Sequence, residues 1–249
     1  MIATRRALPG LALAALLTAG FAPSAAPPPR VCHLPATVVP APVLTPPANE
    51  IVQGVPTAYY MLAMTWAPEA CRGKADDPDL AIQCRANRFG FVLHGLWPNG
   101  SDGRHPRYCG PAGGISPATV RKHLCMTPSP ASLQHEWASH GTCGWSSPEA
   151  YFADAERLWR GLRLPPMPAT LTAGEIRAAL LKANPGVRRD GTYIKTADRG
   201  HLISMVALAG EHPLFKDGNT GDRFGSLSTS VKVAVPVYAV LDLQQQWRH

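Results

Sequence analysis

The chain has 249 residues, of which 45% are hydrophobic and 16% charged, and its formal net charge is +7. After the first 26 residues no stretch is apolar enough to cross a membrane, which argues against an integral membrane protein. A basic balance favours polyanionic partners such as nucleic acid, although a charge of this size is also typical of a mildly basic exported protein.

Residues 1–26 have the pattern of a secretory signal peptide. Arg5 and Arg6 precede an apolar run over Leu8–Phe21, and small residues follow it. A membrane anchor is the alternative, but an anchor needs about 20 consecutive apolar residues, and this run is shorter and contains a glycine. We therefore expect export and cleavage, after which the loss of both arginines leaves a formal net charge of +5.

Residues 27–56 are rich in proline and almost free of charge. Proline fixes its own φ and disfavours helix in the residue before it, so this stretch predicts an extended linker. Residues 57–249 then form one domain of ordinary size. Six cysteines in an exported protein indicate disulfides, but the sequence alone does not choose among fifteen pairings.

Four stretches of the domain have the composition of β-strands. They are apolar, aromatic or rich in valine, and they cover Tyr59–Trp66, Phe89–Leu93, His201–Leu208 and Val231–Leu243. The first is apolar on both faces, which predicts a central strand that ends at Pro68. Pro236 predicts a sheet edge or a bulge for the last. The polar Cys71–Cys84 segment is expected to be a loop, and Asn99–Gly103 a turn.

Three stretches between the strands are expected to be helical. The first is Leu133–Ser139, and Ser147 followed by proline opens the second. Thr172 and Glu175 have the spacing of a capping box for the third, which should end at Asn184–Gly186. Strands on either side of a helical middle predict the α+β class.

Two short motifs bring together the residues suited to catalysis. Phe91–Pro98 reads Phe-Val-Leu-His-Gly-Leu-Trp-Pro, and His135–Cys143 reads His-Glu-Trp-Ala-Ser-His-Gly-Thr-Cys. They offer three imidazoles and one carboxylate, which suits acid–base catalysis: His94, His135, His140 and Glu136. On a helix Glu136 and His140 share a face, and a nearby carboxylate raises an imidazole pKa and orients the ring.

A zinc site is the alternative use of the second motif. The zinc-binding helix motif places two histidines four residues apart, whereas His135 and His140 are five apart. That spacing rotates the rings by about 140° on a helix, so they diverge. We expect no metal and no other cofactor.

The first motif also contains a glycine and a tryptophan with suggestive positions. Gly95 follows His94 and would allow a backbone turn and close approach by a ligand. Trp97 is predicted at the exit of the strand, where its face is available for a base to stack on. Taken alone, His94 and Trp97 are each more typical of a buried core position.

Together the two motifs resemble the active-site segments of the ribonuclease T2 family. Members of this family are secreted, metal-independent endoribonucleases with little base specificity. The matching residues are His94–Pro98 and His135–Cys143. Tyr60–Pro68 resembles the upstream strand of that family, and Cys71 with Cys84 resembles its early disulfide. The resemblance is good over residues 59–152 and faint beyond.

The resemblance implies an α+β fold with an antiparallel central sheet and helices packed on it, and cleavage of single-stranded RNA. His140 would remove the 2′-OH proton, His94 would protonate the leaving 5′ oxygen, and Glu136 would support the phosphorane-like transition state. His135 would hold the phosphate and Trp97 would stack on a base. The product would be a 2′,3′-cyclic phosphate and then a 3′-phosphate. DNA would not be cut because it lacks the 2′-OH.

The same resemblance implies the disulfides Cys71–Cys84 and Cys109–Cys143. Cys32 and Cys125 remain, and a bond between them would pin the linker to the domain. Two free thiols in an oxidising compartment are the less favourable alternative. We expect a monomeric, secreted or periplasmic protein with no membrane association once the signal is removed.

Ser139 departs from the family pattern, which usually has lysine immediately before the last histidine. A lysine would neutralise charge on the phosphoryl oxygens, and losing such a group costs on the order of 100-fold in rate. Arg104, Arg107 and Lys122 are the candidate replacements. The main alternative function is therefore a weakened, RNA-binding pseudoenzyme. A zinc hydrolase and a disulfide-stapled interaction domain are further alternatives.

Overall fold

The computed structural model describes residues 32–101, 103–165, 172–187, 189, 191–197 and 202–209. The expected signal peptide and the expected strand Val231–Leu243 lie outside these residues. Within the described ranges, no helix combines the length and the apolar character needed to cross a membrane.

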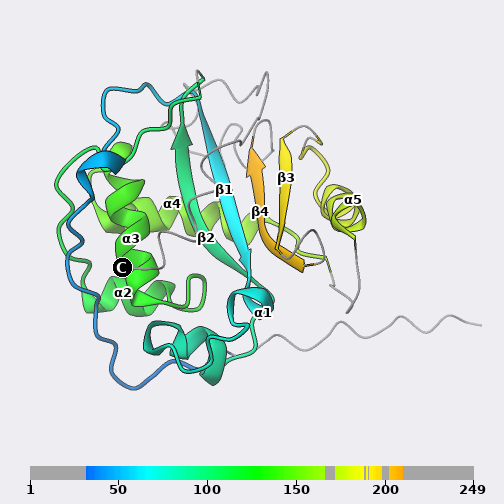
Figure 1. Ribbon diagram of the computed structural model, residues 1–249, viewed down its shortest axis with the longest axis horizontal. Helices are drawn as coiled ribbons and strands as arrows, with labels where there is room; N and C mark the ends of the chain where they lie inside the picture. The colour runs from blue at the N-terminus through cyan, green and yellow to red at the C-terminus, as the bar shows by residue number, and fades with distance from the viewer. Residues whose placement is uncertain are drawn as a thin grey trace, which may run out of the picture. The chain divides into compact units, whose positions relative to one another are not determined.

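A four-stranded antiparallel sheet has the order β2-β1-β4-β3 (Figure 1). Its strands are β1 Tyr59–Trp66, β2 Phe91–Asn99, β3 Thr192–Ala197 and β4 Leu202–Ala209. β1 has the predicted bounds and a central position, and residues 60–64 on both of its faces are buried. β4 begins one residue later than expected. β3 was not predicted, because its short sequence alternates polar and apolar residues only weakly.

β2 is longer than the sequence indicated. It continues to Asn99 rather than ending at Leu93, because it pairs with the whole of β1. Its position at the edge of the sheet tolerates Pro98, which cannot donate to a neighbouring strand. The register shifts between Ala63 and Met64, whose partners are Gly95 and Leu93. The residue between those partners, His94, is therefore the extra residue of a β-bulge.

Five α-helices are described: α1 Ala67–Ala70, α2 Pro117–His123, α3 Pro130–Ser139, α4 Pro148–Gly161 and α5 Ala173–Ala183. α3 begins three residues before Leu133, because Ser129 accepts a hydrogen bond from the Ser132 amide and Pro130 suits the first turn. The capping box of α5 is present. α2 was missed, and Ser116 caps it in the same way.

The expected loop between Cys71 and Cys84 is partly helical. A 3-10 turn covers Pro78–Leu80 and a π-helical stretch covers Ile82–Ala86. Leu80 and Gln83 are buried there. A polar composition therefore misled the prediction, because the segment folds around a few buried side chains.

The main hydrophobic core joins the first two strands to the helices. Leu62 and Leu96 are almost fully buried against residues of α3 and α4, including Leu133 and Tyr151. A second cluster contains Met64 and Phe91 with Ile176 and Leu180 of α5. The core thus fixes β2 against α3, the elements that contain the two sequence motifs.

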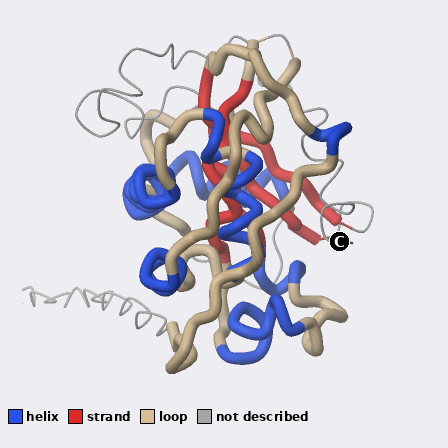
Figure 2. The backbone as a smooth tube through the Cα atoms, turned by 90° about the vertical axis from the view of Figure 1, so that its left-hand side faces the viewer, coloured by secondary structure: helices blue, strands red, loops and turns tan. Residues whose placement is uncertain are grey.

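In the described part of the proline-rich segment, residues 32–56, the one helical element is a 3-10 turn at Ala48–Glu50. In Figure 1 its blue trace runs along the helical side, and Figure 2, seen from that side, shows loops running lengthwise over the helices. Leu34 and Val38 pack on the core. Arg121 donates to the Pro35 carbonyl oxygen at 2.8 Å. This part of the segment is therefore attached to the domain surface.

Three disulfides account for all six cysteines: Cys32–Cys125, Cys71–Cys84 and Cys109–Cys143. The family resemblance implied the second and third of these pairs and left Cys32 and Cys125 as the remaining two cysteines. The first spans 93 residues of sequence and the second only 13. Chain-entropy arguments give the longer loop the larger stabilisation.

We expect the double variant Cys32→Ser/Cys125→Ser to lose about 5 kcal/mol of unfolding free energy, against about 3 kcal/mol for Cys71→Ser/Cys84→Ser. Urea unfolding followed by tryptophan fluorescence measures both. The matched second variant controls for loss of any disulfide. Equal losses, or a larger loss for Cys71→Ser/Cys84→Ser, would show that the Cys32–Cys125 bond does not constrain the unfolded chain more than the shorter loop does.

Candidate active site

The Glu136 carboxylate joins the two motifs. It is 1% exposed, and one oxygen lies 3.2 Å from His94 Nε2. The other accepts a 2.8 Å hydrogen bond from Trp97 Nε1. A Cβ on Gly95 would lie 1.8 Å from this second oxygen, so only glycine fits. The glycine therefore serves the close approach of Glu136 rather than a turn.

His94 is held at both ring nitrogens. Nε2 faces Glu136, and Nδ1 lies 3.0 Å from the Thr65 hydroxyl. The bulge in β2 directs this ring, as bulges near functional sites commonly do. The sequence did not indicate Thr65, because only the pairing of β1 with β2 brings its hydroxyl to the ring.

His140 caps the C-terminal end of α3 with a non-helical backbone. Its ring stacks on Trp97 with centroids 5.2 Å apart, and only 9% of the residue is exposed. Nδ1 is buried and has no hydrogen-bond partner among the described residues. A Cβ on the next residue, Gly141, would lie 2.3 Å from the Trp137 ring, so glycine is needed for the chain to leave the helix here.

Trp97 does not have the role that the sequence suggested. It lies inside β2, is 4% exposed, and contacts both catalytic candidates, with its edge toward His94 and its face against His140. The expectation of an open face for a stacked base was wrong, because β2 continues past this position and the core covers it. Trp97 instead orients Glu136 and His140.

His135 and Ser139 lie on a neighbouring face of α3. Ser139 Oγ is 3.3 Å from His135 Nε2, and the Tyr108 ring approaches His135 edge-on at 6.4 Å. The Tyr108 amide donates to the Ser139 carbonyl at 2.9 Å. Asn99 is buried and donates to the Trp97 carbonyl oxygen.

The ionisable groups have strongly shifted pKa values. Burial alone would raise the Glu136 pKa, but the charge and hydrogen bond of His94 outweigh it and hold the value at about 2. Burial lowers the pKa of His140 to about 3, although the Glu136 charge acts in the opposite direction. Burial likewise lowers the pKa of His135. At neutral pH the site thus contains an ionised carboxylate and a neutral His140.

The described residues contain no group of three or more histidine, cysteine, aspartate and glutamate side chains able to hold a metal ion. His135 faces Ser139 and Tyr108, whereas His140 faces Trp97. The two rings have different neighbours, as their five-residue spacing suggested.

The chain is similar to several known proteins. A probable ribonuclease of Haemophilus influenzae is 35% identical over 160 residues, which cover 59% of this chain and 57% of that protein. A ribonuclease of Aeromonas hydrophila is 41% identical over 85 residues, or 34% and 37% of the two chains. The chain thus spans roughly a third to three fifths of these relatives. A solved ribonuclease-related protein from Calystegia sepium aligns with a TM-score of 0.49 at 22% identity, over 61% of this chain and 84% of that one.

The model of the Ribonuclease T2 family matches residues 57–181, which is half of the chain. The matched range contains both motifs and every site residue described above. The chain belongs to the ribonuclease T2 family.

Proposed function

We propose that this protein is an exported endoribonuclease that cleaves single-stranded RNA by 2′-OH transesterification, with little base specificity and no metal. The observation that supports this most strongly is the contrast between two imidazoles in one site. His94 lies against an ionised carboxylate, whereas His140 is buried and neutral. Groups whose environments differ in this way divide naturally into an acid and a base.

His140 acts as the general base. Its low pKa keeps the ring neutral, with a lone pair free, at mildly acidic pH. It takes the proton of the 2′-OH as the 2′ oxygen bonds to phosphorus. Trp97 stacking holds the plane of the ring during this transfer.

His94 acts as the general acid. As the acid the ring supplies a proton, and the contacts of Nε2 with Glu136 and of Nδ1 with the Thr65 hydroxyl hold its orientation. The proton passes to the 5′ oxygen as the bond from phosphorus to that oxygen breaks. Glu136 also faces the crowded phosphorane-like transition state, and His135 holds the phosphate.

The first product is a 2′,3′-cyclic phosphate. In a second step His94 and His140 exchange roles, and water opens the ring to a 3′-phosphate. The reaction needs a 2′-OH, so DNA is not a substrate. A direct test is incubation of the oxidised protein with single-stranded RNA in excess EDTA, followed by analysis of the product ends. Cyclic or 3′-phosphate ends support the proposal, and intact RNA from folded protein contradicts it.

The three disulfides support an oxidising compartment, so we propose a secreted or periplasmic location. We further propose a monomer without membrane association after signal removal. The RNA-binding pseudoenzyme is the second candidate, and Ser139 is the observation that favours it. It predicts RNA binding without cyclic-phosphate products.

We expect His94→Ala and His140→Ala each to lower kcat about 1,000-fold, because each removes one proton-transfer group. Initial rates on an oligoribonucleotide measure this, and thermal unfolding confirms that each variant is folded. His33→Ala is a matched control, since His33 is outside the site and uses its backbone to bond Asn87. Full activity in either site variant would exclude the two-histidine mechanism.

The pH profile should reflect the buried base. Since the His140 pKa is lowered from 6.5 to about 3, the ring stays unprotonated well below the ordinary imidazole range. We therefore expect kcat/KM to lose little activity between pH 6.5 and pH 5, and to fall only at lower pH. A stopped assay across this range checks the prediction, with circular dichroism at each pH. An acid limb centred near pH 6.5 would contradict it.

A further inference from the structure

Transesterification places negative charge on the phosphoryl oxygens, which preorganised cations stabilise. The second motif supplies no lysine or arginine, since Ser139 precedes His140. Ser139 is fully buried, and its hydroxyl is engaged with His135. If the proposed function holds, the positive charge must come from elsewhere in the fold.

Arg107 lies beside this part of the site. Its guanidinium carbon is 5.3 Å from the centre of the Tyr108 ring, and that ring approaches His135. Burial is the main cause of the lowered pKa of His135 and of His140, and the Arg107 charge adds to the lowering at both rings. Arg104 and Lys122, the other cations considered from the sequence, are exposed.

Tyr108 connects Arg107 to the serine that replaces the expected lysine. The Tyr108 ring lies beside the Arg107 guanidinium, whose carbon is 5.3 Å from the ring centre. The Tyr108 backbone amide donates to the Ser139 carbonyl. The tyrosine adopts φ of 51°, a conformation that non-glycine residues seldom take. The chain thus turns at Tyr108 so that the tyrosine contacts Ser139 through its backbone and the guanidinium through its ring.

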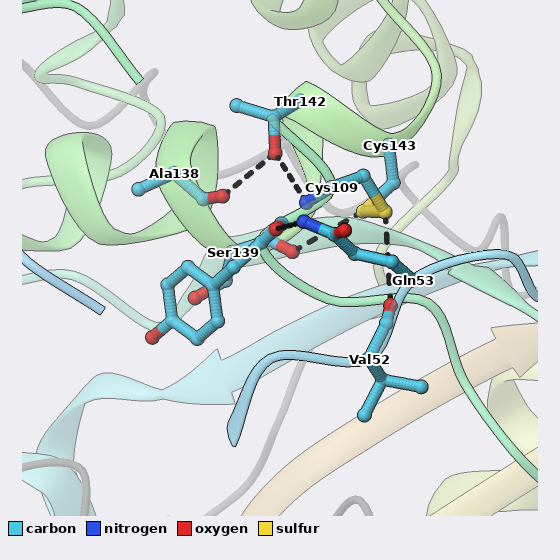
Figure 3. Close-up of a disulfide and its surroundings, with 8 residues drawn as sticks. Val52, Gln53, Cys109, Ala138, Ser139, Thr142 and Cys143 are labelled. Atoms are coloured by element: carbon cyan, nitrogen blue, oxygen red, sulfur yellow. Dashed lines mark hydrogen bonds between the residues drawn. A yellow bond between two sulfur atoms is a disulfide. The ribbon is translucent and has the colours of Figure 1, made fainter. Parts of the chain in front are cut away.

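The N-terminal segment fixes Arg107 in this place. The Arg107 backbone pairs with Val52 in both directions at 2.9 and 3.0 Å, and Gln53 Nε2 donates to the Tyr108 carbonyl at 3.1 Å. Figure 3 shows Val52 and Gln53 beside the Cys109–Cys143 disulfide and Ser139. Glu50 binds Arg107 Nη2 at 2.8 Å. The segment before the domain therefore contributes to the geometry of the site.

The guanidinium retains capacity for a substrate. Glu50 engages Nη2, while Nε is buried without a hydrogen-bond partner among the described residues. The side chain is 18% exposed, so solvent reaches part of it. Arginine presents five donors in a planar fork that suits phosphate oxygens.

We propose that Arg107 binds the phosphate group beside His135 and replaces the lysine absent at position 139. Glu50 and residues 52–53 hold Arg107 in place. Arg107 is then a substrate-binding residue of the proposed ribonuclease site. Ser139 and Tyr108 position it, and residues 50–53 form part of the active-site framework. This inference rests on the proposed function.

The test compares Arg107→Gln, Arg107→Lys and Glu50→Gln in the oxidised full chain. Arg107→Gln should lower kcat/KM on single-stranded RNA about 100-fold, and Arg107→Lys should recover most of that loss. Glu50→Gln should lower kcat/KM much less than Arg107→Gln does, because the amide oxygen still accepts a hydrogen bond from Arg107 Nη2 and the guanidinium itself is retained. Arg160→Gln, an exposed arginine of α4 paired with Glu156, is the charge-matched control.

A second measurement separates phosphate binding from a purely structural role. The probe is a 2′-O-methyl oligoribonucleotide, which cannot be cleaved because its 2′ oxygen has no proton. Arg107→Gln should reduce the slope of log affinity against log salt by about 0.7, the value of one phosphate contact on a single strand. Arg160→Gln should leave the slope unchanged.

The outcomes are distinguishable. Active wild-type protein with an unaffected Arg107→Gln variant, or an unchanged salt slope, would overturn the inference alone. A loss in Glu50→Gln as large as in Arg107→Gln would also overturn it, because the ion pair would then serve only as a brace. Wild-type protein that leaves RNA intact would overturn the proposed function, while a reduced slope in Arg107→Gln would still support phosphate binding by Arg107.

Discussion

The Glu136 carboxylate is the interaction on which the site depends. It lies over the backbone at Gly95, where any Cβ would collide with it, and it binds His94 and the Trp97 indole. A buried charge is costly unless it is paired and hydrogen-bonded. Here both oxygens have partners from β2, so this one group ties α3 to the sheet and sets the positions of the His94 and Trp97 rings.

The same arrangement gives the two catalytic candidates different environments. His94 faces the carboxylate at Nε2, whereas His140 lies under Trp97 at the end of α3, where burial keeps it neutral. Trp97 contacts Glu136 and both rings, so it acts as the common support. A substrate base would have to stack elsewhere, since no face of Trp97 is open.

Sequence patterns predicted β1, the start of α4 and the capping box of α5 well, because apolar runs and local caps act within a few residues. They ended β2 too early, since the strand exists by pairing with β1 rather than by its own composition. The site residues of the two motifs could be named from the sequence. Thr65 could not, because a bulge and a strand register bring it to His94.

The replacement of a charged motif residue illustrates a further limit. Ser139 in place of lysine suggests a weakened site. The sequence alone left three cations as possible replacements for that lysine. The fold places Arg107 beside the ring of Tyr108, whose backbone amide bonds Ser139, through a turn at Tyr108 and a bridge to Val52. Contacts between residues more than fifty positions apart decide this, and no local pattern contains them.

The measurement that tests the central claim most directly is a ¹⁵N NMR titration of the histidine ring nitrogens in the folded protein. The account predicts that His140 keeps the shifts of a neutral imidazole from pH 7 down to pH 5, far below its ordinary titration range. A His140 ring that gains its proton near pH 6.5 would contradict the buried neutral base, and with it the division of roles between the two histidines.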